Sequence, residues 1–162
     1  MTDDQAVAAH DQISSHRYLV HFPAHPARTS DPHYKDFDHL HRTQRQTARC
    51  YVGQRIGFDE CRDAQGNLCP APADDTAKQD GLELHHAHIE FALQQGVDLT
   101  ALEADYPGVS NPDEVGAWVE SANNLRWLCV WHHRGMAGAH TITHSDWEAG
   151  QYVPGLTDKE AK

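Results

Sequence analysis

Three histidines lie within four positions of one another in the stretch GLELHHAHIE, namely His85, His86 and His88. A neutral imidazole can take a proton from water near pH 7, and it is also the commonest metal ligand among side chains. The stretch alone leaves three interpretations open: solvated surface histidines, a zinc site, or the base and metal ligands of a hydrolytic enzyme. A single histidine beside an apolar stretch is usually structural, and we interpret His88 in this way.

A second set of metal-binding side chains lies in residues 123–135, which read NNLRWLCVWHHRG. Cys129 and His132 are separated by two residues, a spacing that lets one turn of the chain place both on a tetrahedral zinc ion. His133 follows His132 directly, and neighbouring residues on a helix point about 100° apart. His132 can therefore bind zinc while His133 faces a different site.

A tetrahedral zinc site needs two more ligands, which upstream cysteines can supply. The chain holds four cysteines, and its acidic beginning is followed by no apolar segment, so we expect an unexported, cytoplasmic protein with reduced thiols. We favour Cys50 and Cys61, because each abuts the boundary of an expected element. Cys69 precedes Pro70 in a polar loop and is the alternative ligand or a free thiol. No apolar run reaches the roughly 18 residues that a membrane span requires.

Together the two stretches resemble the HNH endonuclease family in its zinc-containing phage and bacterial form. The His-His pair of the family stands here in LELHHAH, its Asn-Leu in NNL and its zinc knuckle in LCVWHH, where His132 replaces the last zinc cysteine. The resemblance covers roughly residues 50–140. It implies an α+β fold that has a small zinc-braced ββα-metal (HNH) core with additional helices.

The resemblance also implies a role for each matching residue. His86 would be the general base, and Asn124 would brace the hairpin and orient His86. His85 and His133 would bind a catalytic divalent cation, Mg²⁺, Mn²⁺ or another. The structural zinc would be held by Cys50, Cys61, Cys129 and His132, with Cys69 as the alternative.

The charge of the chain is unfavourable for a polyanionic partner when taken as a whole. It carries 13 Lys and Arg against 24 Asp and Glu, which gives a net charge of −11. A local basic strip can still contact phosphate, however, and residues 41–58 contain four arginines and no acid. Two further arginines flank the zinc knuckle. We therefore expect DNA as the partner, with its backbone contacted by Arg42, Arg45, Arg49, Arg55, Arg126 and Arg134.

The length of 162 residues is that of about one domain. The first thirty or so residues and the last few show no apolar period and are typical of loose chain ends. We therefore predict a flexible N-terminal arm over residues 1–30, an HNH nuclease domain over residues 31–155 and a flexible C-terminal tail over residues 156–162.

The first half of this domain contains one clear helix. Asp31 and Pro32 are typical of a helix cap and first helical position, and the helix is predicted to run to about Ala48. Two glycines in residues 51–61 predict a loop or a short hairpin there. Residues 62–80 are rich in Pro, Asp, Ala and Gly, which predicts a surface loop.

The second half is predicted to contain the hairpin. Residues 82–86 alternate apolar and polar side chains as a strand does, and residues 124–130 are the second strand. The start signal of Asn111 and Pro112 lies between these strands. Helices are predicted at three places: residues 89–96, 112–122 and 131–139.

We expect the protein to act as a metal-dependent DNA endonuclease that nicks one strand or cuts both. The alternative is a non-catalytic zinc-stabilised module that binds nucleic acid or an assembly partner, for example in phage DNA packaging. The net charge favours the alternative. The His-His pair favours the nuclease, because a scaffold has no need of a base beside its metal.

Overall fold

The computed structural model describes residues 22–63, 65–69, 76–144 and 147–148. Residues 1–21 of the predicted arm and the whole predicted tail, residues 156–162, lie outside this described part. The described residues combine several helices with one small sheet, which is compatible with the predicted α+β class. None of the described helices is long and apolar enough to cross a membrane.

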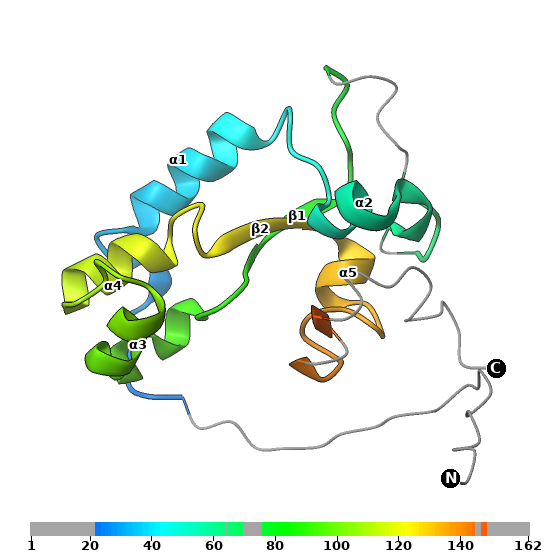
Figure 1. The fold of residues 1–162 in the computed structure, drawn as a ribbon. Helices are drawn as coiled ribbons and strands as arrows, with labels where there is room; N and C mark the ends of the chain where they lie inside the picture. The colour runs from blue at the N-terminus through cyan, green and yellow to red at the C-terminus, as the bar shows by residue number, and fades with distance from the viewer. Residues whose placement is uncertain (1–21, 64, 70–75, 145–146, 149–162) are drawn as a thin grey trace, which may run out of the picture.

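A sheet of two antiparallel strands lies at the centre of the described part (Figure 1). The strands are β1 (Leu82–His86) and β2 (Leu125–Cys129), and every residue of one is paired with a residue of the other. Helix α5 (Val130–Arg134) follows β2 without an intervening loop. The two strands lie where the sequence predicted them, and the short helix after them begins one residue earlier than predicted.

The described part begins with two helical elements, the 3-10 helix η1 (Arg28–Ser30) and the helix α1 (Tyr34–Gln44). The predicted helix began at Pro32, two residues before α1. The N-cap of α1 is His33 and not Asp31, whose carboxylate instead accepts the backbone N–H of His33 at 2.8 Å. That bond closes a separate turn, and α1 begins only after it.

The end of the predicted flexible arm is packed against the rest of the fold. The guanidinium of Arg28 lies over the ring of Phe37, 3.9 Å from its centroid. The same guanidinium forms an ion pair with the buried carboxylate of Glu120 at 3.2 Å. The packed part of the chain therefore begins before residue 31.

Residues 51–61 are helical, so the predicted loop or hairpin was wrong. They form α2 (Tyr51–Ile56) and the 3-10 helix η2 (Phe58–Glu60). Gly53, one of the two glycines that predicted a loop, is instead a buried residue of α2 that lies close to the side chain of Cys61. A Cβ atom at this position would lie 2.5 Å from the sulfur of Cys61, so only glycine leaves room for that sulfur.

The connection between the strands contains three helical elements: η3 (Phe91–Gly96), α3 (Leu99–Asp105) and α4 (Pro112–Val119). The sequence predicted the first as an ordinary helix and the third correctly, but it did not predict α3. The side chains of Asp98 and Asn111 each accept two backbone N–H groups and so cap α3 and α4. The cap at Asp98 was the available signal for α3.

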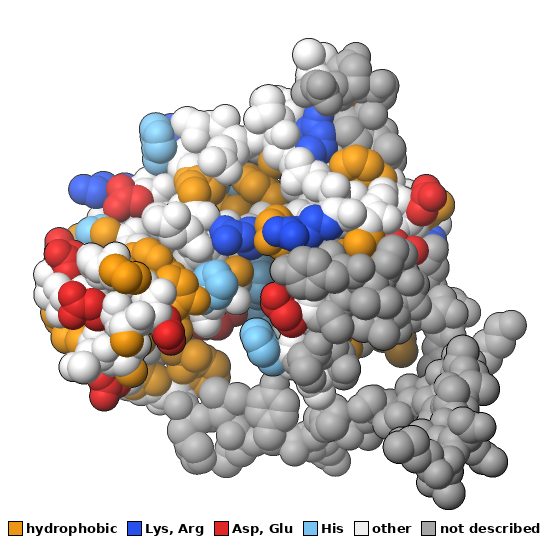
Figure 2. All heavy atoms as spheres, in the orientation of Figure 1, with side chains coloured by type: hydrophobic (Ala, Val, Ile, Leu, Met, Phe, Trp, Pro, Cys, Tyr) orange, Lys and Arg blue, Asp and Glu red, His pale blue; other side chains and the backbone are white. Residues whose placement is uncertain are grey.

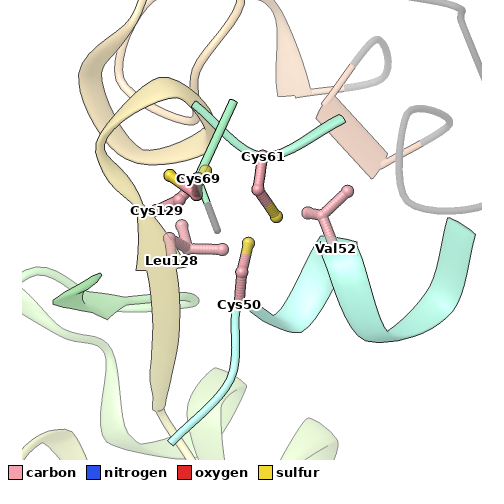
Figure 3. Packing of buried hydrophobic residues seen from close by; sticks show 6 residues of the cluster. All are labelled: Cys50, Val52, Cys61, Cys69, Leu128 and Cys129. Atoms are coloured by element: carbon pink, nitrogen blue, oxygen red, sulfur yellow. The ribbon is translucent and has the colours of Figure 1, made fainter. Parts of the chain in front are cut away.

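Two separate clusters of buried apolar residues stabilise the described part. Figure 1 shows α3 and α4 at one end of the sheet and α2 and α5 at the other. The helical core lies at the first end and consists of Leu102, Val109, Val115, Trp118 and Val119. The cysteine core lies at the second end (Figure 3) and consists of Cys50, Val52, Cys61, Cys69, Leu128 and Cys129.

Candidate metal centres

The first candidate centre has four ligands, each from a different element. Cys50 precedes α2, Cys61 follows η2, Cys129 ends β2 and His132 lies in α5. All four residues are buried, and their ligand atoms lie within 4.8 Å of one another. This is the set that the sequence predicted, and it can hold a metal ion.

Contacts around the sulfurs show how tightly this centre is built. His132 Nδ1 lies 3.2 Å from the sulfur of Cys129 and 3.4 Å from the sulfur of Cys50. The backbone N–H of Arg62 donates to the sulfur of Cys129 at 3.4 Å. Three sulfurs and one imidazole nitrogen make the donor set that a tetrahedral zinc ion prefers.

The protonation equilibria of these groups are strongly coupled. Burial by itself would lower the pKa of His132, but hydrogen bonds with the sulfurs of Cys129 and Cys50 raise that pKa to about 9. Hydrogen bonds from Cys50 and Cys61 lower the pKa of the Cys129 thiol, and the same contact with Cys129 raises the pKa of the Cys61 thiol. Without a metal ion the Cys129 thiolate is thus stabilised by protons that Cys61 and His132 hold, and a divalent cation bound by these ligands would displace those protons.

Cys69 lies beside this centre but outside the four-ligand group. The sequence placed it in a polar surface loop, whereas the structure buries it, with 3% of its surface exposed. Its backbone N–H donates to the carbonyl of Cys61 at 2.8 Å, which carries it into the cysteine core. Burial, followed by the charge of Cys129 and a hydrogen bond with it, raises the pKa of Cys69 to about 12. Cys69 is therefore a buried neighbour of the ligands.

The second candidate centre is formed by three histidines. His85 is the penultimate residue of β1. His133 lies in α5, and His140 lies in the segment that follows α5. Their ligand nitrogens lie within 4.8 Å of one another, and the Nε2 atoms of His133 and His140 are 3.0 Å apart. The sequence predicted the first two members. The sequence did not assign His140 to this group, because its place depends on how the chain folds back after α5.

The ring of His85 is poised to donate a lone pair. Its Nδ1 atom is buried and has no hydrogen-bond partner among the described residues. Burial and then the neighbouring His133 and His140 rings lower the pKa of His85 to about 3, so this imidazole is neutral at physiological pH. An unpartnered buried nitrogen in a neutral ring is the chemistry expected of a metal ligand.

Glu83 orients the second histidine of this group. Its carboxylate oxygen Oε2 lies 2.7 Å from His133 Nδ1. When Nδ1 carries the proton and donates it to this carboxylate, Nε2 keeps its lone pair toward His140. Glu83 and His85 both belong to β1 and are two residues apart, so they share one face of the strand.

His86 faces the opposite side of β1, and the structure does not bring it to His85 and His133. Its Nε2 lies 3.0 Å from a carboxylate oxygen of Glu120, and its Nδ1 lies 3.7 Å from a carboxylate oxygen of Glu90. Its ring stacks on Phe37 with centroids 6.1 Å apart. The separation follows from the alternation of side chains along a strand.

Asn124 ties the end of β1 to the start of β2, as expected from the sequence. Its side-chain oxygen accepts the backbone N–H groups of His88 and Ile89 at 2.9 and 3.0 Å. Its amide nitrogen donates to the carbonyls of Ile89 and Val119 at 2.8 and 2.9 Å. These bonds fix the segment that carries His88. They do not reach the ring of His86.

A cavity of about 390 Å³ opens beside His85, the one member of the three-histidine group that lines it. His88, Tyr51, Arg126 and Glu148 also contribute to its wall. His86 is not among the residues that line it. The cavity is thus the place where a ligand could meet the face of His85 and a cationic side chain together.

The six predicted DNA-contacting arginines fall into two groups. Arg55 and Arg126 approach the same ring, with guanidinium carbons 4.3 and 5.4 Å from the centroid of Tyr51. Figure 2 shows basic side chains in a row across the middle of one face, directly above histidine side chains. We call Tyr51, Arg55 and Arg126 the arginine–tyrosine patch.

The other four predicted arginines lie elsewhere. Arg42 pairs with Asp38 at 2.9 Å and Arg134 pairs with Glu83, so carboxylates offset both charges. Arg45 forms the C-terminal cap of α1, and Arg49 donates to the carbonyl of the preceding residue at 2.8 Å. The continuous strip expected from the sequence is therefore divided between α1 and the cavity.

Comparisons with known proteins add no relative. The chain matches no family model, no curated protein and no solved structure. The HNH resemblance therefore rests on the residues quoted from the sequence. A function for the chain has to be argued from the two ligand groups and the surface around them.

Proposed function

We propose that this protein is a metal-dependent endonuclease of the HNH type that hydrolyses phosphodiester bonds in DNA. One observation carries the proposal: a closed and an open ligand group lie on two sides of the junction between β2 and α5, and His132 and His133 belong to different groups. Structural zinc sites are closed, whereas catalytic sites keep open positions for water or substrate. The hairpin with α5 is the zinc-braced ββα-metal core of this proposal.

The four-ligand group is proposed to hold the structural zinc. The donors suit that ion, since three are cysteine sulfurs and the fourth is an imidazole nitrogen. The ligands join α2, η2, β2 and α5, which meet at the cysteine core. Zinc would then stabilise the end of the fold that presents His133.

The three-histidine group is proposed to hold the catalytic divalent cation. The unpartnered Nδ1 of His85 and the Glu83 contact of His133 fit such a ligand role. A divalent cation bound there would stabilise negative charge on the phosphate and on the departing oxygen. Glu83 would keep His133 in one tautomer, and Asn124 would hold the loop after β1 in place.

The arginine–tyrosine patch is proposed to hold the DNA backbone beside the cavity. Arg126 lines the cavity itself, and Arg55 extends the positive charge away from it along Tyr51. Contacts of arginine with phosphate position the duplex without reading its sequence. The patch is a local group of two arginines on a chain whose net charge is −11, and Glu148 lines the cavity beside it.

The alternative function is a non-catalytic zinc-stabilised module that binds nucleic acid or an assembly partner, for example in phage DNA packaging. The net charge of −11 and the pairing of Arg42 and Arg134 with carboxylates favour this alternative. A module of this kind needs the four-ligand group alone. The alternative gives no reason for three histidines around an unpartnered buried nitrogen.

Supercoiled plasmid tests the proposal directly. The full chain, purified with its tightly bound metal, should convert the plasmid to nicked or linear DNA in Mg²⁺, Mn²⁺ or Ni²⁺, and the weakly held cation should be removable by brief chelation. His133→Ala should lose cleavage and keep a normal circular dichroism spectrum, with His39→Ala as the exposed control on α1. Equal plasmid binding without cleavage in any of the three metals would favour the assembly module.

A further inference from the structure

The histidine that is best placed to act on a ligand in the cavity is not the one that the HNH resemblance indicates. Both ring nitrogens of His86 face carboxylates, those of Glu120 and Glu90, and 8% of this residue is exposed. The Glu120 carboxylate is itself buried and also binds Arg28. A ring held in this way serves to join the segment around Arg28 to the end of β1.

His88 has the opposite surroundings. It lines the cavity together with His85 and Arg126, and it is exposed to solvent. Its ring leans on two aromatic side chains, with centroids 5.4 Å from Tyr106 and 6.1 Å from Trp118. Neither neighbour binds a ring nitrogen of His88 in any described contact, so the aromatic support orients the ring and leaves its nitrogens available.

The backbone of His88 is fixed by a hydrogen bond to the side chain of Asn124. The amide oxygen of Asn124 accepts its N–H at 2.9 Å, and the next N–H binds the same oxygen. Asn124 is completely buried, so the loop that carries His88 is anchored to β2. A positioned imidazole on an anchored loop meets the geometric requirement for a general base.

We propose that His88 is the general base of the reaction, an assignment that rests on the proposed nuclease function. A ring nitrogen of His88 takes a proton from a water molecule in the cavity while the water oxygen bonds to phosphorus. The bond between phosphorus and the 3′ oxygen breaks with its electron pair, and that oxygen takes a proton from solvent. The products are a 5′-phosphate and a 3′-hydroxyl end, and His88 returns its proton to solvent.

The charges around His88 agree with this role. Partial desolvation and the positive guanidinium of Arg126 lower the pKa of His88 below its usual 6.5, and His144 acts in the same direction. The carboxylate of Glu148 acts in the opposite direction. The ring is therefore neutral and able to accept a proton at pH 7.

Three variants of the full chain separate His88 from His86 in the plasmid assay. His88→Ala should lower the cleavage rate by at least about 100-fold, which is the lower figure for general-base assistance, with metal content and DNA binding unchanged. His86→Gln should lower the melting temperature, because the contact with Glu120 is weakened, and should keep the acidic limb of the pH–rate profile. His39→Ala is the surface control and should behave as the wild type.

Rescue by added imidazole distinguishes a general base from a residue that only supports the fold, because free imidazole can replace the missing base and cannot repair a structural defect. Added imidazole should restore cleavage to His88→Ala, because the truncated side chain leaves space in an open cavity, and should leave the rate of His86→Gln unchanged. Cleavage by His88→Ala within a few-fold of the wild type would overturn the assignment alone. A wild-type chain that cuts no plasmid in any metal would overturn the nuclease proposal and the assignment together.

Discussion

The four-ligand group and the three-histidine group use the same kind of side chain in opposite surroundings. Cys50, Cys61 and Cys129 have no exposed surface and His132 has 4%. Of the three histidines, in contrast, His85 is buried, His133 is partly buried and His140 is exposed. His132 and His133 are neighbours on α5, yet one points into the cysteine core and the other toward His85 and His140. A single residue step along the helix, a rotation of about 100°, thus separates a centre that water cannot reach from one that it can.

This difference indicates how the two centres divide the work. A closed centre gains its metal once, during folding, and the ion then contributes to the stability of the fold. An open centre can exchange its ion and accept another ligand. The comparison therefore predicts that damage to the first centre affects folding, and that damage to the second affects binding and catalysis alone.

The largest effect is expected from Cys129→Ser. Structural zinc contributes on the order of 10 kcal/mol to the folding of small domains, so this variant should lose its tightly bound metal and its cooperative thermal unfolding. Elemental analysis and melting curves measure both. Cys69→Ser is the matched control, a buried cysteine of the same core, and should keep one zinc per chain. Full zinc in Cys61→Ser with none in Cys69→Ser would mean that Cys69 is the ligand.

A smaller loss is expected from Gly53→Ala, which leaves every ligand in place. The new Cβ atom would meet the sulfur of Cys61 at 2.5 Å, so that α2 or the ligand must move. Overpacking of this kind costs about 1–3 kcal/mol, and zinc should be lost to a competing chelator faster than from the wild type. Gln54→Ala, on the exposed side of α2, is the control. Unchanged melting temperature and zinc retention would show that the centre can shift to accept the methyl group.

The open centre should respond differently to Glu83→Gln. This change removes the carboxylate that orients His133 but leaves all three histidines, so affinity for the exchangeable cation should fall about 10–100-fold. Isothermal titration of the divalent ion measures the loss, and the melting temperature should change little. Arg134→Gln is the control, because it removes the other partner of Glu83 and spares His133. Loss of the tightly bound zinc in Glu83→Gln would contradict the separation of the two centres.

The smallest effect concerns a histidine that pairs with carboxylates and belongs to neither centre. His33 lies 3.0 Å from Asp36 and 3.2 Å from Asp113. Burial by itself would lower the pKa of His33, but these two carboxylates raise it above 6.5. The stabilisation is therefore fully present below pH 6.5 and is lost as the pH rises through the folded-state pKa.

Urea unfolding of the wild type and His33→Gln at pH 5.5 and pH 8.5 tests this contribution. The variant should be less stable at pH 5.5 by about 0.5–1 kcal/mol, in the range of partly exposed ion pairs, and the difference should shrink at pH 8.5. If the difference in unfolding free energy between the wild type and His33→Gln were the same at the two pH values, His33 would stabilise the fold by hydrogen bonds that do not depend on its charge.

The Cys129–His132 pair of the four-ligand group and both strands were predictable from the sequence because their signals are local. Cys129 and His132 are separated by two residues, and LELHH alternates with the period of a strand. The prediction that Cys50 and Cys61 complete the set also matches the four-ligand group. These two cysteines were preferred to Cys69 because each lies beside the boundary of an expected element.

The remaining features depend on contacts between residues far apart in the sequence. His140 joins the open group only because the chain folds back after α5, and Glu120 binds His86 only because α4 packs near the end of β1. Gly53 was misread because the sulfur that needs its space lies eight positions later in the chain. Composition and periodicity carry no information about such contacts.

The two cores of the fold differ in what keeps them together. The helical core around Trp118 consists of ordinary apolar side chains, while four of the six members of the cysteine core are thiols. A chelator strong enough to remove a metal ion from the four-ligand group would therefore unfold the end of the molecule that contains the cysteine core, while the end that contains the helical core stayed folded. Amide hydrogens of α4 would stay protected from exchange while those of α2 became labile, and the chain would unfold as two cooperative units joined by β1 and β2.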